Sequence, residues 1–233
     1  MLVASTDAIS ITAPVVTGEM RLQSGTFTNA SLNGISVLHT AGISGTSRSA
    51  SVGTLTANGS GSVTAAITTD TAGTLAPVAN TTTTYAVAAN GRATLAASAV
   101  KVVYLTAANA GFVVGNDAAT TTGELEAQAA GPFSASTLTG AFSFGTENVG
   151  SNASSTEVGI ATPDGSGTAA LSIDLSSHSG LSIDNNQSST YTVNADGTGT
   201  ISGDSFIIVS PSKVVVLDSA SGNVNPDVVV LEK

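Results

Sequence analysis

Short runs of apolar and polar residues, separated by glycine-rich turns, make up most of this chain. The second half contains eight of them, at residues 138–144, 157–162, 168–175, 189–194, 198–203, 205–210, 213–219 and 227–233. Residues 170–175 alternate between apolar and polar, which is typical of a strand with one wet face. Residues 206–210 and 213–217 are largely apolar, so we expect them to be the most buried. No window carries an amphipathic helical stripe, and the pattern predicts an all-β protein.

The same pattern occurs twice along the chain. VGTLTANGSG begins at Val52 and VGIATPDGSG begins at Val158, which is 106 residues later. Three further pairs have the same spacing: Tyr85 with Tyr191, Phe27 with Phe133, and Leu125-Glu126 with Leu231-Glu232. Several anchors at one spacing indicate a tandem duplication.

The beginning of the chain resembles the end of a repeat. Residues 15–23, VVTGEMRLQ, are similar to residues 121–128, TTGELEAQ. We therefore interpret residues 1–23 as an N-terminal strand segment, the tail of a preceding repeat and a possible donor strand. The first β repeat then covers 24–130 and the second covers 131–233.

The short links between runs favour antiparallel hairpins between neighbours in sequence. Eight strands in roughly 105 residues can close into an up-and-down barrel, which removes exposed sheet edges. The alternative is an Ig-like or Greek-key sandwich, for which residues 145–156 would supply a longer crossing. The meander of hairpins favours two tandem antiparallel eight-stranded barrels.

One acidic loop, TPDGSG at residues 162–167, is a candidate for a metal or phosphate site. The position equivalent to Asp164 in the first repeat is Asn58, which a cation site would not favour. Asn and Asp both suit turns, and a following glycine supplies a positive φ. We interpret the loop as a turn with Pro163 and Asp164 at its centre and Gly165 in the left-handed region.

Charge is sparse along the chain, with 9% charged residues against roughly 25% in a typical soluble domain. The net charge is −10, and the six cations are scattered at Arg21, Arg48, Arg92, Lys101, Lys213 and Lys233. Nucleic-acid binding is rejected because it needs clustered cations. There is no cysteine, and no apolar run reaches the length of a membrane span, so we expect no membrane insertion. Such a surface fits a glycosylated or assembled protein.

The two histidines do not form a repeated site. The position equivalent to His39 in the second repeat is Gly145, and His178 lies in the polar run LSSHSG. One histidine without cysteine or a second histidine rarely makes a metal site. No Gly-x-Ser-x-Gly elbow opens a helix. We therefore expect no catalytic residue, no cofactor and no metal.

Glu124 and Glu126 lie two apart on a predicted strand and so share a face. Paired carboxylates serve glycoside hydrolysis. Their counterparts in the second repeat are Val230 and Glu232, so the pair is not repeated. Aromatic residues are 4% and tryptophan is absent, which argues against a stacked sugar site. We interpret these residues as a polar strand edge near a domain junction.

Lys101 and Lys213 are candidates for isopeptide crosslinks, but lysine is ordinary in a predicted hairpin. Five asparagines begin Asn-x-Ser/Thr sequons, and they are Asn29, Asn58, Asn80, Asn152 and Asn186. In a chain so rich in serine and threonine, sequons arise by chance, and they leave glycans open as partners.

Four segments of the second repeat carry a resemblance to known proteins. They are PFSASTLTG (132–140), TPDGSG (162–167), STYTVNADGTGT (189–200) and FIIVSPSKVVVLD (206–218). The pattern resembles the tandem ~100-residue β repeats of long secreted or surface bacterial proteins. The first repeat departs from it at residues 102–114. The resemblance implies an extracellular or cell-surface location and brings no catalytic residues.

These observations give two hypotheses for function. The first is a non-enzymatic extracellular structural protein that forms a head-to-tail homopolymer, with residues 1–23 adding strands to the next subunit. The alternative is an adhesin-type binding module from a longer repeat protein, which binds a carbohydrate or a surface.

Overall fold

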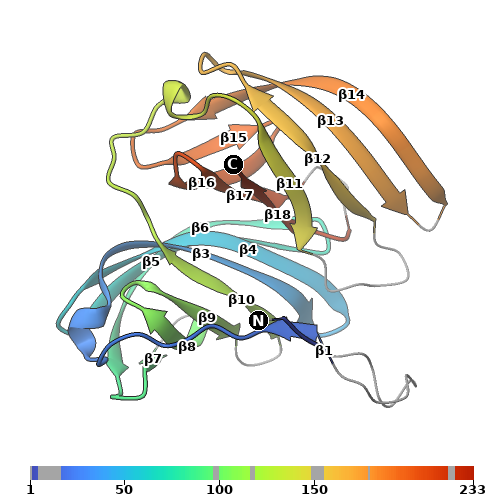
Figure 1. Ribbon diagram of the computed structural model, residues 1–233. Helices are drawn as coiled ribbons and strands as arrows, with labels where there is room; N and C mark the ends of the chain where they lie inside the picture. Colours follow the sequence, from blue (N-terminus) through green and yellow to red (C-terminus); the bar gives the residue numbers. More distant parts are fainter. Residues whose placement is uncertain are drawn as a thin grey trace.

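The computed structural model describes residues 2–4, 17–96, 100–115, 119–147, 155–177, 179–219 and 224–233. The first repeat is a closed barrel of antiparallel strands, each paired with its neighbours in sequence and the last paired with the first (Figure 1). Its strands are β3 (Asn33–Ser44), β4 (Ser47–Asn58), β5 (Ser62–Thr71), β6 (Thr74–Val87), β7 (Arg92–Leu95), β8 (Val100–Ala107), β9 (Ala110–Gly115) and β10 (Ala119–Ala127).

The second repeat is a closed barrel of the same topology. Its strands are β11 (Phe142–Glu147), β12 (Thr156–Pro163), β13 (Thr168–Ser177), β14 (Gly180–Val193), β15 (Thr198–Ile201), β16 (Asp204–Ser210), β17 (Lys213–Asp218) and β18 (Asp227–Glu232). The prediction of an all-β chain with two tandem barrels is confirmed. The Greek-key sandwich is excluded, because each strand hydrogen-bonds to the next and β18 returns to β11.

Each of the eight predicted runs of the second repeat contains a strand, but two predicted boundaries are wrong. The first strand begins at Phe142 rather than residue 138, because η2 (Ala135–Thr137) is a 3-10 turn that precedes it. β14 begins at Gly180, nine residues before the predicted start. Its first half is exposed on both faces, so no alternation marks it as a strand.

The 3-10 turns close one end of each barrel. The Tyr85 hydroxyl lies 2.8 and 2.7 Å from the carbonyl oxygens of Asn29 and Leu32, at and just after η1 (Asn29–Ser31). The Tyr191 hydroxyl makes the same contacts with η2, at 3.2 and 3.3 Å. Both tyrosines are buried, so their hydroxyls need such partners. The duplication therefore extends to how each barrel is capped.

The TPDGSG loop is a turn, as predicted. Backbone N–H groups two and four positions later donate to Asp164 Oδ1 at 2.7 and 3.0 Å. In the first repeat, Asn58 Oδ1 accepts the two equivalent hydrogen bonds, at 2.9 and 3.0 Å. Placing Pro163 and Asp164 at the centre was wrong. The Asp164 N–H donates to the Thr168 carbonyl at 2.9 Å, so pairing continues to Asp164 and the loop starts at Gly165, where φ is +77°.

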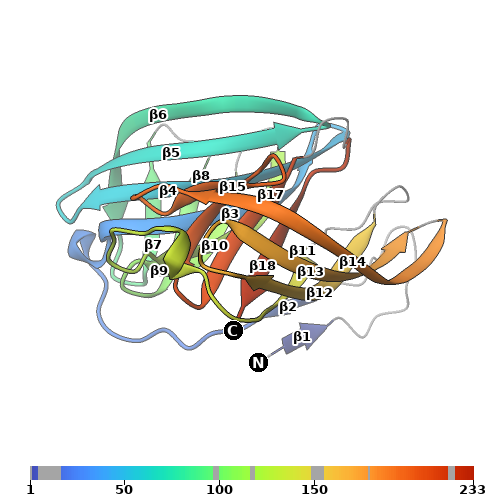
Figure 2. The same ribbon diagram turned by 90° about the horizontal axis from the view of Figure 1, so that it is seen from above.

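A third apolar cluster lies between the two barrels, in addition to the core inside each. β16, β17 and β18 lie against β3 and β4 (Figures 1 and 2). The cluster consists of Val37, Ala41, Ala50 and Val52 from the first barrel, and Ile207, Val209, Val215, Leu217 and Val228 from the second. These strands are therefore buried on both faces. That explains the apolar runs at 206–209 and 214–217 and confirms that they are among the most buried.

Candidate functional site

The N-terminal segment forms a small sheet of its own. β1 (Leu2–Ala4) pairs antiparallel with β2 (Thr17–Glu19), and among the described strands these two pair only with each other. By sequence, β2 is equivalent to the part of β10 at residues 122–124. The segment therefore has the sequence of a barrel's last strand while lying outside both barrels.

A glutamine docks each linker onto the barrel that follows it. Gln23 Nε2 donates to the carbonyl oxygens of Asn90 and Leu105, at 3.0 and 2.7 Å. Gln128 Nε2 makes the corresponding contacts with the second barrel, at 3.0 and 2.9 Å. The backbone N–H of the next residue also donates in both linkers, at 3.0 and 2.8 Å. Residues 23 and 24 thus meet the first barrel as residues 128 and 129 meet the second.

Arg21 fixes the N-terminal segment to the outer face of β9 and β10. Its guanidinium donates to Glu19 at 2.7 Å and to Glu124 at 2.7 Å, and it lies 5.1 Å from the centre of the Phe112 ring. Hydrogen bonding to Glu19 and the charge of Glu124 raise the pKa of Arg21 above its usual value, despite partial burial. The candidate carboxylate Glu124 is therefore part of this junction.

The second junction has its own ion pairs, centred on Lys213. Its Nζ lies 2.8 Å from Glu126 Oε1 and 2.9 Å from Glu232 Oε1. Burial alone would lower the pKa of Lys213, but hydrogen bonds to Glu126 and Glu232 outweigh it and raise the pKa. Glu124 and Glu126 each have a different cationic partner at a repeat junction, which agrees with the junction interpretation. Lys101 lies in β8, and its side chain falls outside the described part.

Two pairs of polar side chains connect the barrels directly. Arg48 donates to Asp227, and both side chains are buried. Burial lowers the pKa of Arg48. His39 is buried and its Nε2 lies 2.9 Å from Glu147 Oε2. Burial would raise the pKa of Glu147, but the hydrogen bond and charge of His39 outweigh it and lower the pKa.

The remaining candidate residues from the sequence lie away from these junctions or outside the described part of the chain. His178 and Asn152 lie outside the described residues. Asn29 Oδ1 accepts a hydrogen bond from the Val87 N–H at 2.8 Å, while Asn80 and Asn186 are exposed on β6 and β14. The structure brings none of the asparagines that it describes to the junctions.

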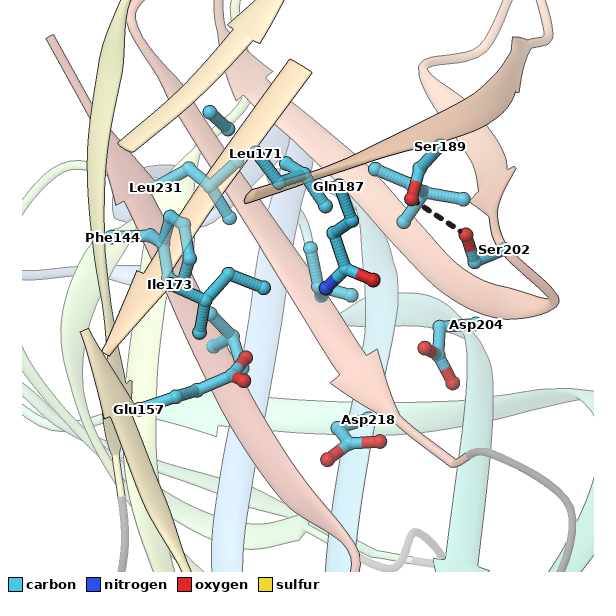
Figure 3. Close-up of a pocket in the computed structure, with 14 residues that line it drawn as sticks. Phe144, Glu157, Leu171, Ile173, Gln187, Ser189, Ser202, Asp204, Asp218 and Leu231 are labelled. Atoms are coloured by element: carbon cyan, nitrogen blue, oxygen red, sulfur yellow. Dashed lines mark hydrogen bonds between the residues drawn. The ribbon is translucent and has the colours of Figure 1, made fainter. Parts of the chain in front are cut away.

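The second barrel contains a cavity of about 230 Å³ at one end (Figure 3). Its apolar wall includes Phe144, Leu171, Ile173, Val216 and Leu231. Its polar lining includes Gln187, Ser189 and Ser202, and three carboxylates, Glu157, Asp204 and Asp218. The cavity therefore combines an apolar wall with an acidic group from each of three strands.

Burial, and then the charge of neighbouring carboxylates, raises the pKa values of Asp204 and Glu157. Burial raises the pKa of Asp204 to about 6, even though the Ser219 N–H donates to its Oδ1 at 2.9 Å. Burial and the charges of Asp218 and Asp204 also raise the pKa of Glu157. Across the described residues, no group of three or more such side chains is arranged to hold a metal ion. The cavity favours a cationic organic ligand over an anionic one.

The acidic lining is specific to the second barrel. At the positions of the three carboxylates, the strand registers place Ser51, Lys101 and Gly115 in the first barrel. A separate interior hollow is shared by both barrels and measures about 10 Å³ in the first and about 30 Å³ in the second. The acidic lining of the cavity is therefore not part of the repeated pattern.

Sequence reasoning missed both the cavity and the linker glutamines. Glu157, Asp204 and Asp218 come from separate strands, and only the register brings them together. Gln23 and Gln128 could have been found from the sequence, because each ends one of the two similar stretches TGEMRLQ and TGELEAQ.

Comparison with protein-family models, with curated proteins and with solved structures found no match, which leaves the geometry of the chain as the basis for a function. Within the described part of the chain, no helix could cross a bilayer.

Proposed function

We propose that this chain is an extracellular structural protein, the subunit of a surface filament that assembles head to tail through β-strand addition by residues 1–23. One observation supports the proposal above others: residues 23 and 24 dock onto the first barrel with the hydrogen bonds that residues 128 and 129 make with the second. Gln23 repeats the hydrogen bonds of Gln128, and Arg21 stands at the position of Glu126. These similarities support the proposal that the segment acts as the end of a preceding unit.

The strand addition takes place at the β1–β2 pair. Both barrels are closed rings, so their strands present no open edge to an incoming strand. The pair β1–β2 has an outer edge on each strand, and among the described strands none occupies it. Unpaired backbone N–H and C=O groups on such an edge bind an extended segment of another subunit. A heterologous contact of this kind produces a filament unless its rotation closes a ring.

Negative-stain electron microscopy tests this proposal. The full chain is compared with a truncation lacking residues 1–22, which retains Gln23 and both barrels. We expect filaments from the full chain and single particles with an unchanged β circular-dichroism spectrum from the truncation. Filaments from the truncated chain contradict a role for the N-terminal strands.

The cavity of the second barrel favours a second candidate function, an adhesin-type binding module. Its carboxylates suit a protonated amine, and its apolar wall suits the carbon face of a sugar ring. The ligand class that combines both is a glycan bearing an unsubstituted amino sugar.

The binding function is tested by thermal melting at pH 7.5 with glucosamine and with N-acetylglucosamine, which has no charge. We expect glucosamine alone to raise the melting temperature, and the effect to disappear in Asp204→Asn. Equal shifts with both sugars, or none, contradict this function.

A further inference from the structure

Each barrel has a further outer face that is exposed, although it is equivalent by repeat to a face buried between the two barrels. One is the outer face of β11 and β12, here called the β11–β12 face, which includes Val158 and Ile160. The other is the outer face of β8 and β9, here called the β8–β9 face, which includes Tyr104, Phe112 and Val114. Each is equivalent by repeat to one side of the apolar cluster between the barrels.

The β11–β12 face corresponds to the side that the first barrel contributes. Val158 is equivalent to Val52, which belongs to the interbarrel cluster and is 1% exposed. Val158 itself is 57% exposed, and Ile160, two residues further along the same face, is 52% exposed. The same position is therefore covered in one barrel and bare in the other.

The β8–β9 face corresponds to the side that the second barrel contributes. Arg92 pairs with Tyr104 and the equivalent Thr198 pairs with Ile207, so Tyr104 and Ile207 are equivalent. Tyr104 is 45% exposed and Ile207 is 5% exposed.

The same holds one strand further along the sheet. The pairing of β8 with β9 and of β16 with β17 makes Val114 equivalent to Leu217. Val114 is 48% exposed and Leu217 is 0% exposed. Large apolar side chains are thus exposed at positions whose counterparts are buried.

We propose that the β11–β12 face of one copy packs against the β8–β9 face of the next copy, by the same rotation and translation that relates the two barrels within one chain. The occupant is a second copy because the complementary face is present on this chain and the interbarrel cluster already joins two such faces. The N-terminal segment of the next copy lies beside the β8–β9 face, where Arg21 covers Phe112. This inference rests on the proposed function and names its contact surfaces.

The contact between copies lacks two side-chain pairs that the contact within a chain contains. The buried Arg48–Asp227 pair is not repeated, because Thr121 stands at the position of Asp227. The His39–Glu147 pair is not repeated either, since Gly145 stands at the position of His39. No linker joins the two copies, so the association depends on protein concentration.

Cysteine cross-linking tests the proposal directly, because the natural chain has no cysteine. Val158→Cys and Val114→Cys variants of the full chain are treated with a bis-maleimide of about 10 Å, alone and mixed in equal amounts. A head-to-tail contact places the two different faces together. We expect at least tenfold more cross-linked dimer in the mixture than in either variant alone. An equal yield in all three samples overturns the proposal.

Sedimentation velocity supplies the second measurement. Val158→Lys/Ile160→Lys should remove the concentration-dependent association of the full chain, because a lysine on each position leaves a charge in the contact. The matched control is Leu181→Lys/Ile183→Lys, which changes two exposed residues of β14 outside both faces and should associate like the natural chain. Equal loss of association in both variants overturns the proposal.

The two proposals fail in different ways. Filaments without selective cross-linking mean that other surfaces build the polymer, so the contact proposed here is wrong. Selective cross-linking without filaments means that the faces meet but the filament function is wrong. If the cysteine variants do not cross-link selectively and the natural chain does not associate, both proposals are overturned.

Discussion

At the scale of single residues, the turns explain why aspartate and asparagine exchange between the repeats. One side-chain oxygen of Asp164, and likewise of Asn58, accepts hydrogen bonds from the backbone N–H groups two and four residues later. The hydroxyl of Ser166 and the backbone N–H of Thr168 also lower the pKa of Asp164, to about 2. The sequence comparison alone was enough to predict a turn there, because turn geometry needs the oxygen and not the charge.

Asp204 gives the clearest pH dependence. Its pKa of about 6 in the folded protein lies above the ordinary 3.8, so the folded state holds a proton between these values that the unfolded state has lost. The stability from this proton is therefore present at low pH and is lost as the pH rises through 6.

We expect Asp204→Asn to leave the free energy of unfolding unchanged at pH 4 and to raise it at pH 8. The gain should be about 1 kcal/mol after allowance for solvent screening. Urea unfolding at the two pH values measures it. A gain of the same size at both values would show that packing, not titration, is responsible.

At the scale of elements, the strands with clear alternation or continuous apolar runs were predictable, and those governed by distant contacts were not. β16 and β17 stand out in the sequence because both of their faces are buried. The first half of β14 lacks any apolar pattern because both of its faces are exposed. The cavity depends on the registers of β12, β16 and β17, which no local pattern encodes.

The linkers are the elements whose single contacts matter most. Gln128→Ala removes two hydrogen bonds and leaves the part-buried carbonyl of Ile208 without that donor. We expect a loss of about 1–2 kcal/mol in the stability of the second barrel and faster proteolysis near residues 128–134. Limited proteolysis followed by mass spectrometry detects it.

Gln187→Ala, an exposed glutamine of β14, is the matched control for this variant and should be cleaved at the natural rate. Cleavage of Gln128→Ala at that same rate would mean that its hydrogen bonds do not hold the linker.

At the scale of the whole molecule, the interbarrel cluster makes two barrels behave as one body. Val52 is buried between the barrels, whereas its equivalent Val158 is exposed. Val52→Lys therefore buries a charge or separates the barrels, at a cost of about 3–5 kcal/mol.

We expect calorimetry of Val52→Lys to show two unfolding transitions in place of one, because each barrel retains its own core. Val158→Lys is the same substitution at the equivalent site and should leave the calorimetric trace of dilute protein unchanged. A single transition in Val52→Lys would mean that the rest of the interface and the linker keep the barrels coupled without Val52.

The closure of each barrel has a mechanical consequence. The first and last strands are neighbours: Ser36 near the start of β3 pairs with Ala127 at the end of β10, and Ser143 pairs with Glu232 in the second barrel. The chain enters and leaves each barrel at the same end of this seam. Tension along a filament that pulls on the chain therefore opens the seam one hydrogen-bonded pair at a time, instead of shearing all pairs together. Each barrel would lengthen under modest load and close again when the load is removed.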